Sequence, residues 1–344
     1  MNHGYSRDAY FDNLRFVLIF LVVAGHFLLP LDKTRFSNNI FYLIYSFHMP
    51  CFIFVSGYFS KSVIRDGRFR TGKLFQLLWL YLVFKVLVHV TEGMVEGHIG
   101  FYIDFFTESG APWYLLSLAL WYVTLPVVRE LKPGAVMVGS LILGLLAGYE
   151  NSVGSFLAMD RTIAFAPFFY AGYYVNQDIK ERFVHTKVRI PFLTAGALIA
   201  GFLFLCTYDL LMPYMNVVYG VKYARFGENL YPYGALIRGL WYLAASLLSL
   251  GLMAAIPDKK GIFTIIGSRT LQIYILHRVI RDLFQYFGFY NIVQVSSKLW
   301  ILSLLALSFL LTAALGNSWL EKVFSWLRSL PFSYGRRHFN KTIS

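Results

Sequence analysis

The sequence predicts an all-α, polytopic integral membrane protein with about ten transmembrane helices and both termini in the cytoplasm. The chain of 344 residues is 57% hydrophobic and only 14% charged, whereas a soluble domain carries about 25% charged residues. Its mean hydropathy is +0.56, and its 24 Tyr and 7 Trp residues suit a protein with two membrane–water interfaces. No long hydrophilic stretch exists for a separate soluble domain, so residues 1–344 are predicted to form a single transmembrane domain.

Ten apolar runs predict the helices, because about 17–25 apolar residues cross a hydrocarbon core of roughly 30 Å. In chain order the runs are 14–31, 40–59, 74–91, 113–129, 133–149, 162–178, 190–208, 234–256, 268–288 and 299–317.

The runs differ in the polar residues that interrupt them. The first two contain His26 and His48, the third contains Lys85, and the eighth contains one arginine. The fourth, sixth, seventh and tenth are predicted from their apolar length alone, and the fifth is short. The ninth contains Arg278 and Arg281, which are expensive in hydrocarbon.

The distribution of basic residues predicts the orientation. With an even number of helices both termini lie on one side, and the segments on that side contain 21 Lys and Arg residues, against six in the opposite loops. The positive-inside rule therefore places both ends in the cytoplasm. The net charge of +13 is then mostly an inner-face charge beside anionic lipid, which excludes nucleic acid as the partner.

Arg15 and His26 form the first candidate site. Eleven residues of α-helix advance about 16.5 Å and complete three turns plus roughly 20°, so the two side chains share one face of the first helix. Arginine suits phosphate, and neutral histidine is the usual general base. Asp12, one turn before Arg15, is expected to orient the guanidinium as an i,i+3 partner. The alternative is a boundary arginine beside a histidine that bonds a neighbouring helix.

His48 in the second helix is the next candidate. It is expected about 10 Å below the outer surface and His26 about 8 Å below it, so both could face one cavity. Structural support by His48 is an equally good interpretation. Ser56 and Gly57 should allow close helix approach.

Four further arginines, Arg161, Arg238, Arg278 and Arg281, are predicted in the outer half of the membrane. They could line a cavity for an acidic or polyhydroxyl acceptor or stabilise an oxyanion; the alternative is pairing with helix ends and lipid headgroups. The string HRVIRD (277–282) fits an H-x4-D pattern, but its His and Asp lie about 140° apart on a helix. We interpret the pattern as coincidence and keep His277 as a cavity-lining candidate.

Several stretches resemble one family. YFDNLRFVLIFLVVAGH, with an Arg ten residues before a His, and FHMPCFIFVSGYFSKS are similar to the membrane-bound acyltransferase-3 superfamily, with a closer likeness to its fucose 4-O-acetylase-like branch. PWYLLSLALWY (112–122), DRTIAFAPFFYAGYY (160–174) and IIGSRTLQIYILH (265–277) agree with it. The resemblance implies a ten-helix enzyme that moves an acyl group, usually acetyl, from cytoplasmic acyl-CoA to a hydroxyl on a glycan or similar acceptor.

Carried over by position, the resemblance implies that His26 is the essential histidine and that Arg15 is its partner on the acyl-CoA side. Arg161 matches a recurrent family arginine, and Trp113 is a weaker match. Acetyl-CoA is expected as a donor substrate rather than a tightly bound cofactor, with its nucleotide held by Arg15 and the inner loop that contains Lys61 and Arg65. His26 would then act as a base or accept the acyl group briefly.

A transporter or exporter of a polar glycan is the alternative from another class, because buried Arg and His also mark substrate pathways. Transporters often contain repeated halves, and no repeat is seen here. Motifs for metalloproteases, P-loop ATPases and serine hydrolases are absent from the sequence, and no metal site is expected. The expected location is a bacterial plasma membrane; the acceptor and the oligomeric state stay open.

Overall fold

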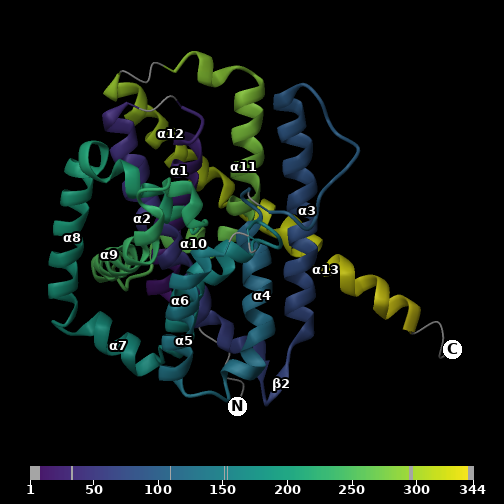
Figure 1. Cartoon of the computed structure of the whole chain (residues 1–344). Helices are drawn as coiled ribbons and strands as arrows, with labels where there is room; N and C mark the ends of the chain where they lie inside the picture. Colours follow the sequence, from purple (N-terminus) through teal and green to yellow (C-terminus); the bar gives the residue numbers. More distant parts are fainter. Residues whose placement is uncertain are drawn as a thin grey trace.

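The computed structural model describes residues 8–31, 34–108, 110–150, 152, 154–293 and 297–339. All ten predicted runs fall on helices (Figure 1). These helices are α1 (Ala9–Leu28), α2 (Arg35–Ser60), α3 (Thr71–Glu96), α4 (Trp113–Val128), α5 (Pro133–Leu146), α6 (Met159–Tyr174), α8 (Arg189–Cys206), α9 (Gly234–Ala255), α11 (Thr270–Tyr286) and α12 (Lys298–Leu315).

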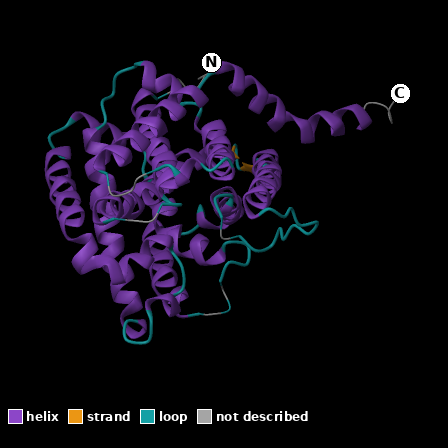
Figure 2. Ribbon diagram, turned by 90° about the horizontal axis from the view of Figure 1, so that it is seen from above, coloured by secondary structure: helices purple, strands orange, loops and turns teal. Residues whose placement is uncertain are grey.

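Three helices lie outside those runs: α7 (Gln177–His185), α10 (Ile262–Gly267) and α13 (Ser318–Phe339). In the described part of the chain the only strands are β1 (Ile64–Arg65) and β2 (Arg68–Phe69), which form the small hairpin in Figure 2. Short 3-10 or π segments are η1 (Lys61–Val63), η2 (Ala147–Tyr149), η3 (Thr207–Leu211), η4 (Met212–Tyr219), η5 (Tyr223–Phe226), η6 (Tyr231–Tyr233) and η7 (Phe289–Asn291).

Within the described residues, six helices are long and apolar enough to cross a membrane: α1, α2, α3, α8, α9 and α12. α4 and α5 are apolar but shorter. α6 and α11 are shorter too, and each carries charged residues near the candidate site, which lowers its hydropathy. The helical membrane class is confirmed, whereas ten crossings and cytoplasmic termini stay predictions. The chain ends, 1–7 and 340–344, lie outside the described residues.

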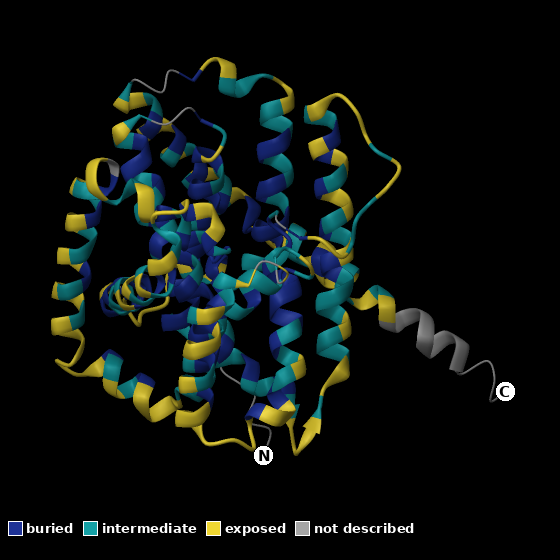
Figure 3. Ribbon diagram, in the orientation of Figure 1, coloured by how far each residue is buried: buried dark blue, intermediate teal, exposed yellow. Residues whose placement is uncertain are grey.

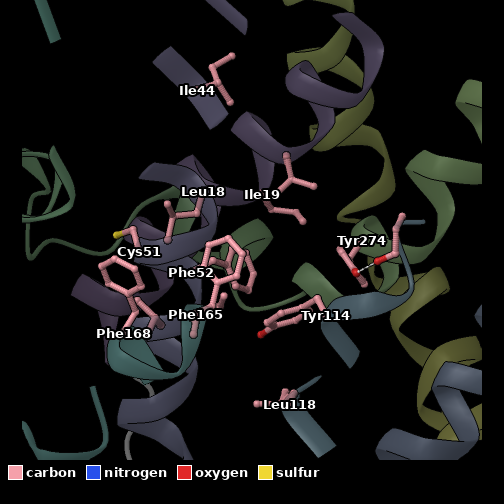
Figure 4. Close-up of a cluster of buried hydrophobic side chains, with 14 of the residues drawn as sticks. Leu18, Ile19, Ile44, Cys51, Phe52, Tyr114, Leu118, Phe165, Phe168 and Tyr274 are labelled. Atoms are coloured by element: carbon pink, nitrogen blue, oxygen red, sulfur yellow. Dashed lines mark hydrogen bonds between the residues drawn. The ribbon is translucent and has the colours of Figure 1, made fainter. Parts of the chain in front are cut away.

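α1 is the buried helix of the bundle and packs against α2, α10, α11 and α12. α8 instead exposes most of its side chains, as Figure 3 shows, and so resembles a lipid-facing helix. Figure 4 shows buried side chains from α1, α2, α4, α6 and α11 that meet in one cluster, among them Leu18, Phe52, Tyr114 and Phe165. The candidate histidine of α1 is therefore supported from several sides.

The loop from α3 to α4 folds back into the bundle. Tyr81 and Lys85, near the middle of α3, bond to the carbonyls of Phe105 (3.0 Å) and Thr107 (2.9 Å). Lys85 also forms a 2.9 Å ion pair with the buried Glu108. α4 therefore begins level with the middle of α3, and Figure 1 shows α4 occupying only the lower half of the bundle.

The segment before α6 pairs with this loop. Thr107 and Phe156 form an isolated antiparallel bridge, and the amide of Glu108 donates to the carbonyl of Ser155 at 2.9 Å. This pairing places the first residues of α4 and α6 beside each other. Trp113 and Arg161, which are 48 positions apart in the sequence, come together for that reason.

Candidate active site

Arg15 lies on a continuous α1 that also carries His26. Its Nη1 donates to Asp12 Oδ1 at 2.9 Å, which confirms the predicted i,i+3 pair. The guanidinium carbon lies 4.1 Å from the centroid of the Phe59 ring of α2. A carboxylate and an aromatic face therefore hold the guanidinium in the N-terminal half of α1, where 23% of its side chain is exposed.

A cleft of about 1450 Å³ opens beside Arg15. Its walls come from the start of α1, the end of α2, the end of α6 and α7. The lining residues are Asp8, Ala9, Asp12, Arg15, Tyr58, Phe59, Lys61, Ser62, Arg129, Tyr173, Tyr174, Asn176, Gln177, Lys180, Glu181, Asp258 and Ser268. This volume exceeds that of an ordinary small-molecule site, about 300–1,000 Å³, and so suits a ligand as large as a nucleotide with an arm.

Charges in the cleft are balanced, with four cations and four carboxylates in its lining. Lys180 pairs with Glu181 at 2.9 Å and with Asp8 at 3.2 Å. Burial alone would lower the pKa of Lys180, but these two partners outweigh it and raise the pKa. The hydrogen bond from Lys180 lowers the pKa of Glu181, so this pair stays ionised at neutral pH.

Lys61 differs from the other cations of the cleft. Its Nζ donates to the carbonyl of Val175 and lies 4.4 Å from the centroid of the Tyr58 ring. Among the described residues no carboxylate lies within ion-pair distance of it. Lys61 is therefore the cation of the cleft most available to an anionic ligand. Arg65 lies on the exposed β1–β2 hairpin, where it pairs with Asp66 at 3.6 Å, and it does not line the cleft.

His26 lies at the other end of the same helix face, beside His277 of α11. The two imidazole rings meet edge-on with centroids 5.0 Å apart. His26 Nδ1 is buried and has no hydrogen-bond partner among the described residues, while the residue as a whole keeps some accessible surface. His277 has no accessible surface, so of these two rings only His26 is exposed to a ligand.

His48 of α2 lies behind a tyrosine. Its Nδ1 contacts the carbonyl of Ile44 at 2.7 Å, and its ring meets the Tyr45 ring at 4.9 Å. Tyr45 in turn covers Gly25, where an added Cβ would lie 2.9 Å from the ring. Tyr45 thus contacts both His48 and the turn of α1 before His26. The bond of His48 within its own helix favours the support role.

Arg161 and Trp113 form a second cluster. The guanidinium carbon lies 5.5 Å from the centroid of the Trp113 ring, and the Arg161 amide donates to Asp160 Oδ1 at 2.7 Å. Among the described residues the guanidinium itself makes no hydrogen bond. Its donors are therefore available to an oxyanion or an acceptor.

Arg238 contacts the protein itself, whereas the sequence suggested that it could contact an acceptor. It is 1% exposed, donates to the carbonyls of Gly144 (2.8 Å) and Val221, and stacks at 4.5 Å on Tyr223. Arg238 therefore ties α9 to α5 and to the loop before η5. This geometry favours the structural alternative.

The His and Asp side chains of the HRVIRD string point in different directions, as the helix geometry predicts. His277 turns to His26, whereas Asp282 is fully buried beside Arg278 and Arg281 and accepts a 2.8 Å bond from Thr91. Arg278 also pairs with Glu92 of α3. The two arginines of α11 thus belong to a neutralised network between α3 and α11.

Sequence reasoning missed Tyr45 and the Thr91–Asp282 contact. Tyr45 lies in a run with many aromatic residues and has no distinguishing signal. The HRVIRD pattern did not identify Asp282 as a site residue. The usable signal is its spacing, because a carboxylate four residues after an arginine on an apolar helix indicates an ion pair. Among the described residues no group of three or more His, Cys, Asp or Glu side chains is placed to hold a metal ion.

Comparisons with known proteins show the family of the chain. The family model described as an acyltransferase domain matches residues 8–317. The nodulation protein NolL of Sinorhizobium fredii is 30% identical over 192 residues, which is 52% of this chain and 51% of that protein. NolL of Mesorhizobium japonicum is 29% identical over 135 residues, 36% of each chain.

The matched region thus spans about half the length of the first of these curated relatives and about a third of the second. No solved structure matches the chain. The family match, by contrast, covers α1 through α12 and includes the three candidate histidines and all the arginines discussed above. The chain therefore belongs to the acyltransferase-3 family.

Proposed function

We propose that the protein is an integral membrane O-acyltransferase that moves an acyl group, foremost acetyl, from cytoplasmic acyl-CoA to a hydroxyl of a cell-surface glycan or its precursor. Ten membrane crossings with both ends inside, in a bacterial plasma membrane, form part of the proposal. The observation that carries it is the pairing on α1: Arg15 lines a cleft large enough for a nucleotide, and His26 lies about three turns away on the same face.

The donor is proposed to bind with its nucleotide in the cleft. Lys61 lacks a carboxylate partner among the described residues, and Arg15 stands where the cleft meets α1. The pantetheine arm would follow the helix face from Arg15 toward His26. Ile19 and Val22 lie on that face and are buried in the core, so the arm requires their side chains to move aside.

The chemistry proposed for His26 begins with the acceptor hydroxyl. The imidazole takes the hydroxyl proton as the oxygen attacks the thioester carbonyl. A C–O bond forms and the C–S bond breaks. The departing sulfur takes the proton from His26, so coenzyme A leaves as the free thiol. The same residues allow a second route, in which the imidazole accepts the acyl group first and then passes it to the hydroxyl.

Arg161 is proposed to act on the acceptor side. Its guanidinium donors are free of described partners and lie beside the Trp113 ring, an arrangement that suits a developing oxyanion or a polyhydroxyl acceptor. A sugar acceptor, in line with the fucose 4-O-acetylase-like resemblance, would meet both an aromatic edge and a cation here.

The test uses the purified protein in nanodiscs with [14C]acetyl-CoA and p-nitrophenyl glycosides of fucose, galactose and glucose. We expect label on at least one glycoside and stoichiometric release of free thiol. In parallel, mass profiling of surface glycans from cells with and without the gene should show the loss of one acyl ester. Absence of transfer in both arms would refute the proposal.

A glycan transporter is the second candidate, favoured by the buried charge network of Arg278, Arg281 and Asp282. Its discriminating measurement is uptake of labelled glycosides into proteoliposomes without acetyl-CoA. Uptake without acyl transfer would support the transporter and overturn the enzyme.

A further inference from the structure

His277 and His26 each carry a buried nitrogen without a hydrogen-bond partner among the described residues: Nδ1 of His26 and Nε2 of His277. A buried polar atom without a partner destabilises the fold, so two of them on neighbouring rings call for a physical reason. The rings meet edge-on at 5.0 Å between centroids.

The hydrogen-bond network assigns the proton of His277. Its Nδ1 lies 3.0 Å from the carbonyl oxygen of Ile273, and a carbonyl only accepts. Nδ1 therefore carries the hydrogen, and in a neutral imidazole the other nitrogen then holds the lone pair. His277 Nε2 is thus an acceptor without a donor.

His26 supplies a matching donor. Each ring nitrogen lies about 1.1 Å from its centroid, so an N–H···N bond of roughly 2.9–3.0 Å joins rings whose centroids are about 5 Å apart. The structure has no such bond between the two rings, but rotation about χ2 of histidine, a broad torsion, changes which nitrogen His26 presents to His277.

We propose that His277 is a positioning residue that accepts a hydrogen bond from Nδ1–H of His26 and thereby keeps the lone pair of His26 on Nε2. This inference rests on the proposed acyl transfer. Nε2 of His26 makes no hydrogen bond to described residues and is not among the buried atoms, so it is the nitrogen that an acceptor hydroxyl can reach. The free histidine side chain favours the opposite tautomer, in which that nitrogen carries the proton.

Among the described residues no carboxylate pairs with His277, because Asp282 and Glu92 pair with Arg278 and Arg281. A fully buried imidazole without a counter-ion favours its neutral form. When His26 takes the acceptor proton on Nε2, its Nδ1–H becomes a stronger donor, and the neutral acceptor on His277 stabilises the imidazolium.

Two substitutions separate this role from mere packing. His277→Asn places an amide nitrogen near the Nδ1 position and can keep the bond to the Ile273 carbonyl, but it removes the acceptor. His277→Gln places its amide near the Nε2 position, where its oxygen can accept from His26. We expect Asn to lower kcat about tenfold or more with the KM for acetyl-CoA within about twofold. We expect Gln to retain most of kcat.

A spectroscopic measurement tests the tautomer without activity. In 15N-histidine-labelled protein in nanodiscs, the signal lost in His26→Asn identifies His26. We expect it to carry its proton on Nδ1 in the wild type and in His277→Gln, and on Nε2 in His277→Asn. A wild-type proton on Nε2 would overturn the inference, as would equal losses of kcat in both variants or no effect of Asn. If the wild type transfers no acetyl group yet shows the Nδ1 proton, the proposed function fails while the pairing stands.

Discussion

Gly57 of α2 lies so close to α6 that a Cβ atom there would be 2.0 Å from the carbonyl oxygen of Phe169. The relationship is reciprocal, because a Cβ at Gly172 of α6 would be 1.9 Å from the carbonyl oxygen of Phe54. The helices therefore cross backbone to backbone, as membrane helices do through small residues. The crossing joins the ends of α2 and α6, which both line the cleft beside Arg15.

Gly57→Ala and Gly172→Ala should each destabilise the protein, because a methyl group has no room at either position. Overpacking costs about 1–3 kcal/mol, and backbone atoms cannot yield as a side chain would. The measurement is thermal unfolding in detergent followed by tryptophan fluorescence. Gly201→Ala in α8, where an added Cβ meets nothing within 4 Å, is the matched control and should be neutral or slightly stabilising. Equal midpoints for all three variants would contradict the packing argument.

The Asp12–Arg15 pair was predictable from the sequence, because it depends on local spacing. A close helix approach at Gly57 was predictable because glycine has no side chain, whereas its partner α6 was not. The positions of all ten helices were predictable for a similar reason, since apolar length alone determines them. The Arg15–His26 face followed from helix geometry within one element.

The features of the site that the sequence did not predict depend on contacts between distant segments. The Trp113–Arg161 cluster arises because the loop after α3 folds inward and pairs with residues before α6. The sequence of that loop, which is polar and lacks Lys and Arg, predicts only that it lies on the outer side. The partner of His277 depends on the rotation of α11 relative to α1. The burial of Arg238 depends on carbonyls of α5 and of the segment at Val221, which no local pattern reveals.

His26→Ala should abolish acyl transfer while leaving expression and membrane insertion intact. General acid–base catalysis by a positioned side chain contributes about 10²–10⁴-fold, so the residual rate should fall at least a hundredfold. The assay is label transfer from [14C]acetyl-CoA to the active glycoside. His98→Ala, at an exposed position after α3, is the control and should match the wild type. Undiminished transfer by purified His26→Ala would remove His26 from the mechanism.

Arg161→Ala should lower kcat about 10²–10³-fold if the guanidinium stabilises the oxyanion, with a small change in the acceptor KM. If Arg161 mainly holds the acceptor, the KM should rise while kcat falls little. Arg225→Ala is the control, because Arg225 is exposed and its charge also acts on Arg161. Initial rates over an acceptor series separate the two outcomes. An equal loss of activity in Arg225→Ala would mean that the effect arises from long-range charge and not from contact of Arg161 with the substrate.

Arg15→Ala should chiefly weaken donor binding, because Arg15 lines the cleft whereas His26 is expected to meet only the reacting thioester. Loss of a charge-assisted contact costs about 1.5–3 kcal/mol, which is roughly tenfold to a hundredfold in affinity. Arg15→Lys should restore only part of the affinity for coenzyme A, because an ammonium cannot reproduce the guanidinium fork that bonds Asp12. Calorimetric titration of coenzyme A into the protein in nanodiscs measures the effect.

Arg65→Ala is the matched control for that titration, because Arg65 is 75% exposed on the β1–β2 hairpin outside the cleft. Its affinity for coenzyme A should equal that of the wild type, since an exposed cation contributes little to a ligand it does not touch. His26→Ala should also bind coenzyme A normally while losing turnover. If His26→Ala instead loses coenzyme A and Arg15→Ala keeps it, the donor enters from the end of α1 opposite to the cleft.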